Sequence, residues 1–152
     1  MTATSSGSYI LLVEDDVRDV EMTIRALRRH GIMEEIHVAR DGAEALAVLF
    51  GDEEARKPAA PPPRFVLLDL KLPKVNGIEV LRRIKGDPAL RVLPVVAFTS
   101  SREGPDVRAC YQLGINSYLV KPLDYREFSE VLRQAGVYWN ALNEPPSDGG
   151  GR

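Results

Sequence analysis

Five short apolar runs, each followed by a helical pattern, constrain the fold of this chain more than any other feature. The runs predict strands at 9–13, 35–39, 64–69, 94–98 and 117–120. Strands separated by helices lie parallel, and right-handed crossovers place helices on both faces of the sheet. The pattern therefore predicts a doubly wound α/β fold, and 152 residues are enough for one such domain.

The predicted helices have clear start signals and apolar faces. Asp41, Asn76 and Asp124 each precede a helical segment and are followed three residues later by Glu, a common start signal. Pro105 is predicted at the first position of the fourth helix, and Gly114 ends it. The apolar positions predicted to face the core are Val17, Val20, Ile24 and Leu27 in the first helix, Ala43, Leu46, Ala47 and Phe50 in the second, Val107, Cys110 and Tyr111 in the fourth, and Phe128, Val131, Leu132 and Ala135 in the fifth.

Composition narrows the possible partners and location. The 20 basic and 22 acidic residues are spread along the chain, so a nucleic-acid partner is not expected. No apolar run approaches the roughly 20 residues that cross a bilayer, and residues 1–8 lack the pattern of a signal peptide. We therefore expect a cytoplasmic protein without membrane contact. Cys110 has no partner for an intrachain disulfide and is predicted to be a small core or interface residue.

The strand and helix patterns set the expected domain boundaries. They predict one domain over 8–142, preceded by a flexible N-terminus at 1–7 and followed by a disordered tail at 143–152 that is rich in Pro and Gly. A second segment outside the pattern, 51–63, is predicted to be a loop. Because the predicted domain takes up almost all of this sequence, no separate output domain is expected.

Polar side chains follow the strands at the points where they end. Glu14 and Asp15 follow the first strand, Asp69 ends the third, Thr99 follows the fourth and Lys121 follows the fifth. Sheets of this type bind ligands at the carboxyl ends of their strands. Carboxylates gathered there repel one another unless a cation joins them. The sequence therefore predicts a cation-binding acidic cluster with Asp69 as its reactive member. Asp16 instead stands where it would cap the first helix.

Four motifs in order, Leu-Leu-Val-Glu-Asp-Asp, Leu-Leu-Asp-Leu-Lys-Leu-Pro, Phe-Thr-Ser-Ser and Tyr-Leu-Val-Lys-Pro, give the chain a strong resemblance to a known family. From Tyr9 to Trp139 the sequence resembles the CheY-like receiver domains of two-component response regulators. The resemblance implies a flavodoxin-like five-stranded parallel sheet with the strand order 2-1-3-4-5.

The resemblance also implies a role for each polar group. Asp69 would accept a phosphoryl group from a phosphohistidine of a sensor kinase, and Lys121 would pair with Asp69 or its phosphoryl oxygens. Thr99 would donate its hydroxyl to the phosphoryl group. Mg²⁺ would be bound by Asp15 and Asp69 directly, by Glu14 through water and by the backbone carbonyl of Lys71, in keeping with its preference for oxygen ligands. Phosphoryl transfer depends mainly on positioning and electrostatics, so such a metal fits the chemistry.

Switching and its reversal are predicted from the same resemblance. Thr99 and Tyr118 match the two residues that move on phosphorylation, although Tyr118 is alternatively a half-buried aromatic without a switching role. Lys71 and Ser101 match positions that modulate dephosphorylation, and the lysine predicts slow loss of phosphate. Pro122 is predicted to follow a cis peptide bond that directs Lys121.

The fifth helix indicates a protein partner. Its apolar pattern continues through Tyr138, Trp139 and Leu142, which predicts a homodimer through the face made by the fourth helix, the fifth strand and the fifth helix. The alternative is that Tyr138 and Trp139 fold back on the same chain. Among single-domain receivers, the sequence is similar to the regulators paired with bacterial and cyanobacterial phytochromes. A phytochrome kinase and a downstream phosphotransfer protein are therefore candidate partners.

Two other function classes stay open at this point. One is a structural dimerisation module that is never phosphorylated. The other is a magnesium-dependent phosphatase with an aspartyl-phosphate intermediate, but its second acid would stand two residues after the nucleophile, where this chain has Lys71. The leading hypothesis is a phosphoacceptor signalling protein whose only enzymatic chemistry is its own phosphorylation and dephosphorylation.

Overall fold

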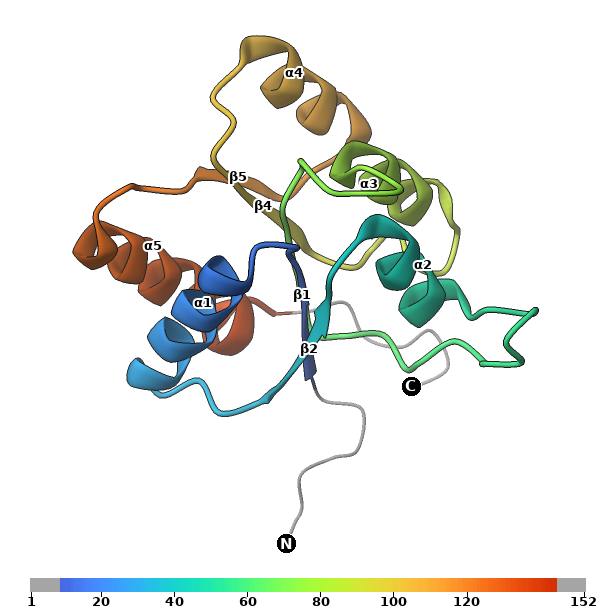
Figure 1. Cartoon of the computed structure of the whole chain (residues 1–152), viewed down its shortest axis with the longest axis horizontal. Coiled ribbons are helices and arrows are strands. Elements are labelled where there is room, and N and C mark those ends of the chain that lie inside the picture. Colours follow the sequence, from blue (N-terminus) through green and yellow to red (C-terminus); the bar gives the residue numbers. More distant parts are fainter. Residues whose placement is uncertain (1–8, 145–152) are drawn as a thin grey trace, which may run out of the picture.

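The computed structural model describes residues 9–144, which form one parallel sheet with helices on both faces (Figure 1). The strands are β1 (Tyr9–Val13), β2 (Glu35–Ala39), β3 (Val66–Leu68), β4 (Val95–Thr99) and β5 (Ser117–Val120), in the order β2-β1-β3-β4-β5. The predicted fold class and strand order are confirmed. Only β3, shorter at both ends, and β4, shifted by one residue, differ from the predicted bounds.

Within residues 9–144, five helices and one terminal turn cover the sheet. They are α1 (Val17–Arg29), α2 (Gly42–Phe50), α3 (Gly77–Gly86), α4 (Gly104–Leu113), α5 (Tyr125–Val137) and the π-helical turn η1 (Tyr138–Leu142). Figure 1 shows α1 and α5 on one face and α2, α3 and α4 on the other. Alternate side chains of β1 enter different cores: Leu11 packs with the α2–α4 side, and Leu12 packs with the α1–α5 side.

The predicted helix starts form as expected. Asp16, Asp41, Asn76 and Asp124 each accept a hydrogen bond from the backbone N–H three residues later. Gly114 ends α4 with φ of 97°, a left-handed conformation that favours glycine. Pro105 occupies the second helical position rather than the first, because α4 begins at Gly104.

Several apolar positions lie on a different face from the one predicted. Val17 and Tyr111 are exposed, and α2 buries Gly42, Ala45 and Leu49 instead of Ala43. The packing of α2 against the β3–α3 loop decides its rotation, since a Cβ on Gly42 would overlap the backbone carbonyl of Val75. Helix α2 is apolar around most of its circumference, so periodicity alone did not identify the buried side.

The chain beyond α5 partly folds back on the domain. The half-buried Trp139 packs against the core on the α1–α5 side, and the Arg64 guanidinium donates to the Asn140 carbonyl at 2.5 Å. Tyr138 and Leu142 stay exposed. The predicted N-terminal segment 1–7 and all but the first two residues of the predicted tail 143–152 lie outside the described residues. Within residues 9–144, no helix is both long and apolar enough to span a membrane.

Candidate functional site

Three carboxylates meet at the carboxyl end of the sheet. β1 and β3 are parallel neighbours with Val13 opposite Leu68, so the residues that follow each strand emerge side by side. One carboxylate oxygen from each of Glu14, Asp15 and Asp69 lies within 4.8 Å of the others. Glu14 and Asp69 are buried, whereas Asp15 is exposed. A compact set of oxygen donors open to solvent on one side fits Mg²⁺, which prefers oxygen ligands and keeps several waters.

Lys121 joins this cluster from the end of β5. Its ammonium donates to Glu14 Oε1 at 2.6 Å, Asp19 Oδ2 at 2.7 Å and Asp69 Oδ2 at 3.3 Å. The lysine side chain is only 9 % exposed, so these carboxylates take the place of water around the charge.

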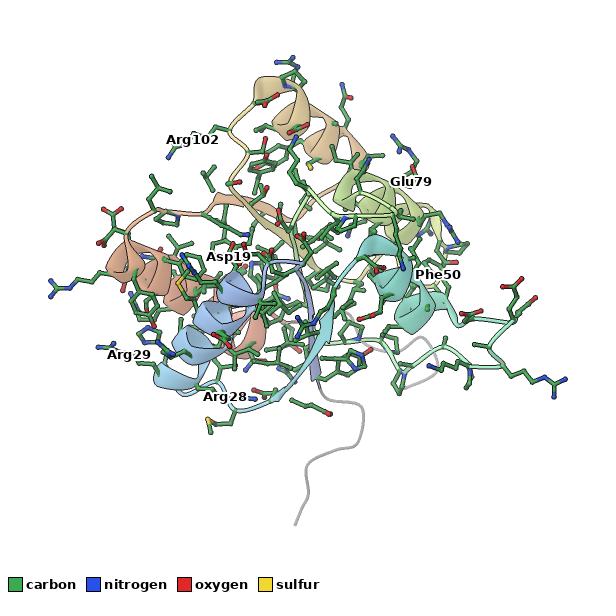
Figure 2. All side chains as sticks on the ribbon, viewed as in Figure 1. Asp19, Arg28, Arg29, Phe50, Glu79 and Arg102 are labelled. Carbon is green, nitrogen blue, oxygen red and sulfur yellow. The ribbon has the colours of Figure 1, made fainter. Side chains whose placement is uncertain are left out.

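Sequence reasoning missed Asp19. It lies in the first turn of α1, three residues after the cap Asp16 (Figure 2). Its carboxylate accepts a hydrogen bond from Lys121. The available signal was the helical spacing, which places Asp19 at the start of α1 close to the end of β1. Asp16 itself lies outside the cluster as a cap, although its backbone N–H donates to Glu14 Oε2 at 3.1 Å.

The pKa values of Glu14 and Lys121 are both raised, but for different reasons. Burial, aided by the Asp69 charge, raises the pKa of Glu14 to about 7 despite the hydrogen bond from Lys121. Burial alone would lower the pKa of Lys121, but its hydrogen bonds with Asp19 and Glu14 and the Asp69 charge raise it. Lys121 is therefore charged at neutral pH and balances the acids around it.

The predicted cis peptide bond before Pro122 is wrong, since every peptide bond among the described residues is trans. An X–Pro bond favours trans by about 0.5–1 kcal/mol unless the surroundings oppose it. The direction of Lys121 is held by its three carboxylate partners instead.

Ser101 connects Thr99 and Tyr118 behind the acidic cluster. The fully buried Thr99 hydroxyl accepts from the backbone N–H of Ser101 at 3.3 Å. The Tyr118 hydroxyl donates to the Ser101 carbonyl at 3.0 Å, and burial raises the pKa of Tyr118. Ser101 Oγ donates to Asp106 Oδ2 on α4 at 2.6 Å. Asp106 is a second polar residue of this region that sequence reasoning did not single out.

Lys71 lies beside the cluster but directs its charge away from it. Its backbone N–H approaches Asp69 Oδ1 at 3.4 Å, whereas its ammonium lies 3.6 Å from Asp106 Oδ2. Asp15, Lys71 and Asp106 line a common surface hollow of about 390 Å³. The structure thus brings all the residues predicted for the site to one end of the sheet, with Thr99, Tyr118 and Ser101 forming a second row.

Comparison with known proteins supports the same family. The family model described as the response regulator receiver domain matches residues 10–133. A probable methanogenesis regulatory protein of Methanothrix harundinacea, FilR2, is 41% identical over 90% of this chain and 86% of its own length. The response regulator Rcp1 of a Synechocystis strain is 37% identical over 86% of this chain and 87% of its own length.

Solved structures of similar proteins share the architecture. The Mn²⁺-bound form of Rcp1 has a TM-score of 0.81 at 35% identity, with 92% of this chain and 99% of that chain covered. The phosphorylated cyanobacterial phytochrome response regulator RcpA has a TM-score of 0.82 at 33% identity, with 93% and 100% covered. The bacteriophytochrome response regulator RtBRR is 49% identical, with a TM-score of 0.68 and 91% and 84% covered. The chain belongs to the family of response regulator receiver domains.

Proposed function

We propose that this receiver domain is a phosphoryl-accepting switch in two-component signalling and that Asp69 is the acceptor. The observation that carries this proposal is the setting of Asp69. It is a buried carboxylate at the end of β3, 3.3 Å from the Lys121 ammonium and clustered with Glu14 and Asp15. Such a carboxylate can approach an anionic phosphoryl group only if positive charge screens the repulsion.

In the proposed reaction, a carboxylate oxygen of Asp69 attacks the phosphorus of a phosphohistidine on a sensor kinase. A P–O bond to Asp69 forms, the P–N bond breaks, and the departing imidazole takes up a proton. Lys121 would pair with the oxygens of the transferred group as a point charge. Thr99 would donate its hydroxyl to the same group, and Tyr118 would follow its movement.

The residues proposed to hold Mg²⁺ are Glu14, Asp15, Asp69 and the backbone carbonyl of Lys71. Their donors are oxygen atoms, and the three carboxylates are within reach of a single small cation. A bound Mg²⁺ would supply positive charge that offsets the acids and the phosphoryl oxygens. The Mn²⁺-bound form of Rcp1 supports a divalent cation in this family.

The proposed donor is a sensor histidine kinase of the phytochrome class. RcpA is described as a cyanobacterial phytochrome response regulator and RtBRR as a bacteriophytochrome response regulator, and the chain covers most of both. FilR2, by contrast, is described as a probable methanogenesis regulatory protein, so a panel of kinases is the appropriate test. The phosphorylated protein would act through protein contacts or by passing the phosphoryl group on. It would bind neither nucleic acid nor membrane and would be located in the cytoplasm.

The proposed form of the signalling protein is a homodimer through the face of α4, β5 and α5. Tyr111 on α4 and Tyr138 at the end of α5 present exposed aromatic surface, which is common at protein interfaces. A dimerisation module without phosphorylation is the competing function. The clustered acids around Lys121 favour the phosphoacceptor, since a purely structural module has no need of them.

Labelling of Asp69 tests the proposal. We would incubate the protein with Mg²⁺ and autophosphorylated histidine kinases, phytochrome kinases included, and separately with acetyl phosphate. The parent should become labelled and Asp69→Asn should not. Asp16→Asn is the matched control, because Asp16 is a nearby acid that only caps α1, and it should keep the label. An unlabelled parent would overturn the proposed function, and a labelled Asp69→Asn would overturn the choice of acceptor.

A further inference from the structure

Several hydrogen bonds meet at Ser101, including one that its Oγ accepts from the backbone N–H of Glu103 at 3.4 Å. Ser101 is 8 % exposed, and its N–H, carbonyl and hydroxyl bind Thr99, Tyr118 and Asp106 respectively. An O–H donor at 2.6 Å from a carboxylate oxygen is a charge-assisted hydrogen bond, stronger than one between neutral groups. The Asp106 carboxylate is therefore held firmly in place.

The other partner of Asp106 is held much less firmly. Lys71 Nζ lies 3.6 Å from Asp106 Oδ2, and the lysine side chain is 62% exposed against 19% for Asp106. Solvent-exposed ion pairs of this kind contribute little free energy. Asp106 thus has a strong hydrogen bond from Ser101 and a weak ion pair with Lys71. The Lys71 ammonium can move away at little cost in free energy.

The place of this pair makes it relevant to Asp69. Lys71 is two residues beyond Asp69, and its backbone N–H already lies 3.4 Å from Asp69 Oδ1. Its side chain lines the hollow that also holds Asp15 and Asp106. The same hollow gives solvent a way to the cluster. A doubly charged phosphoryl group on Asp69 would compete with Asp106 for the exposed ammonium of Lys71.

We propose that Asp106 is a positioning residue that sets the lifetime of the phosphoryl group on Asp69 by drawing the Lys71 ammonium away from it. The inference rests on the proposed function. Loss of the group occurs when a water oxygen forms a bond to phosphorus, the P–O bond to Asp69 breaks, inorganic phosphate leaves and a water proton passes to solvent. A Lys71 ammonium on the phosphoryl oxygens hinders the approach of that water, and Asp106 opposes this arrangement.

The test is the rate of phosphate loss after the phosphoryl donor, acetyl phosphate, is removed. Asp106→Asn keeps an acceptor for the Ser101 hydroxyl but removes the charge that holds Lys71, so the half-life should lengthen about two- to fivefold, within the range of a weak ion pair. In a Lys71→Met background, Asp106→Asn should change the half-life little. Asp106→Glu restores the charge and should bring the half-life back towards that of the parent.

Thermal unfolding of each variant provides the structural control. A purely structural role for Asp106 would lower the melting temperature without dependence on Lys71. An unchanged half-life in Asp106→Asn, or the same change with and without Lys71, would overturn the inference while the labelled parent still supports the proposed function. A parent that acetyl phosphate and kinases both fail to label would overturn the two together.

Discussion

The ammonium of Lys121 lies closer to Asp19 than to Asp69, at 2.7 Å against 3.3 Å. Asp19 belongs to α1 and Lys121 follows β5, so the contact joins segments that are 102 residues apart in the chain. Lys121 therefore connects α1 with the ends of β1 and β3 through its three carboxylate partners. It would have to loosen its hold on Asp19 to bind a phosphoryl group on Asp69 more closely.

Replacing Lys121 with methionine should destabilise the protein in the presence of a chelator. Glu14 and Asp69 would then lie buried without their counter-charge, which costs about 3–5 kcal/mol in the free energy of unfolding. Excess Mg²⁺ should reduce this loss in the free energy of unfolding relative to the parent, because a cation bound by the same acids replaces the missing charge. Urea unfolding with and without Mg²⁺ measures both effects.

Lys74→Met is the matched control for that experiment. Lys74 also lies near a carboxylate, 3.6 Å from Asp41 Oδ2, but its side chain is 70% exposed. Its loss should change the free energy of unfolding by about 0.5 kcal/mol at most. Equal losses in the free energy of unfolding of the two variants would contradict the role of Lys121 as the counter-charge of the buried acids.

Gly77→Ala should disturb the site through the backbone. A Cβ at Gly77 would overlap the carbonyl of Asp69 and lie 2.7 Å from Leu70 Cα, and backbone atoms cannot step aside as a flexible side chain would. We expect a loss of about 3 kcal/mol or more in the free energy of unfolding and weaker Mg²⁺ binding by calorimetry. Gly86→Ala, at the end of the same helix with no atom within 4 Å, should be stabilising by about 0.5–1 kcal/mol.

Cys110 should react slowly with alkylating reagents while the protein is folded. It is the fully buried residue of α4, and burial together with the Asp106 charge raises the pKa of its thiol to about 11. Iodoacetamide should label it at neutral pH only after urea is added. Rapid labelling of the folded protein would show that α4 opens readily.

The same thiol predicts a loss of stability in alkaline solution. An acid whose pKa is higher in the folded state than in the unfolded state binds its proton more tightly when folded. The contribution of the Cys110 thiol to the free energy of unfolding is therefore complete below pH 9.0 and is lost between pH 9.0 and about pH 11. Urea unfolding across this interval should show the decrease in the parent. Cys110→Ala should show a smaller decrease, and an equal slope would contradict the prediction.

Tyr111 should matter for association but not for folding. It is 57% exposed on α4, so Tyr111→Glu should leave the melting temperature nearly unchanged and prevent a dimer through the α4–β5–α5 face. Light scattering at micromolar concentration, with beryllofluoride in place of the phosphoryl group, measures the mass. Met33→Glu, at a 70% exposed apolar residue away from this face, is the control that should still dimerise. A monomeric parent with beryllofluoride would contradict the predicted homodimer.

Sequence periodicity and cap residues were enough to predict the fold, because these signals act locally. Asp16, Asp41, Asn76 and Asp124 cap their helices as expected, and strands and helices alternate along the chain as predicted. The order of the strands within the sheet is the one that the family resemblance implied. The rotation of α2 was wrong because the helix is apolar on more than one side. The close contact of Gly42 with the β3–α3 loop determines that the face with Gly42, Ala45 and Leu49 is the buried one.

The sequence by itself determined which acids, hydroxyls and lysine end the strands, since the alternation of strands and helices brings all strand ends to one edge of the sheet. Only the tertiary structure decided how they pair. Asp19 of α1 pairs with Lys121, which is 102 residues away, and Asp106 of α4 pairs with Lys71, which follows β3. Such contacts depend on distances between elements far apart in the chain, and no local pattern encodes those distances.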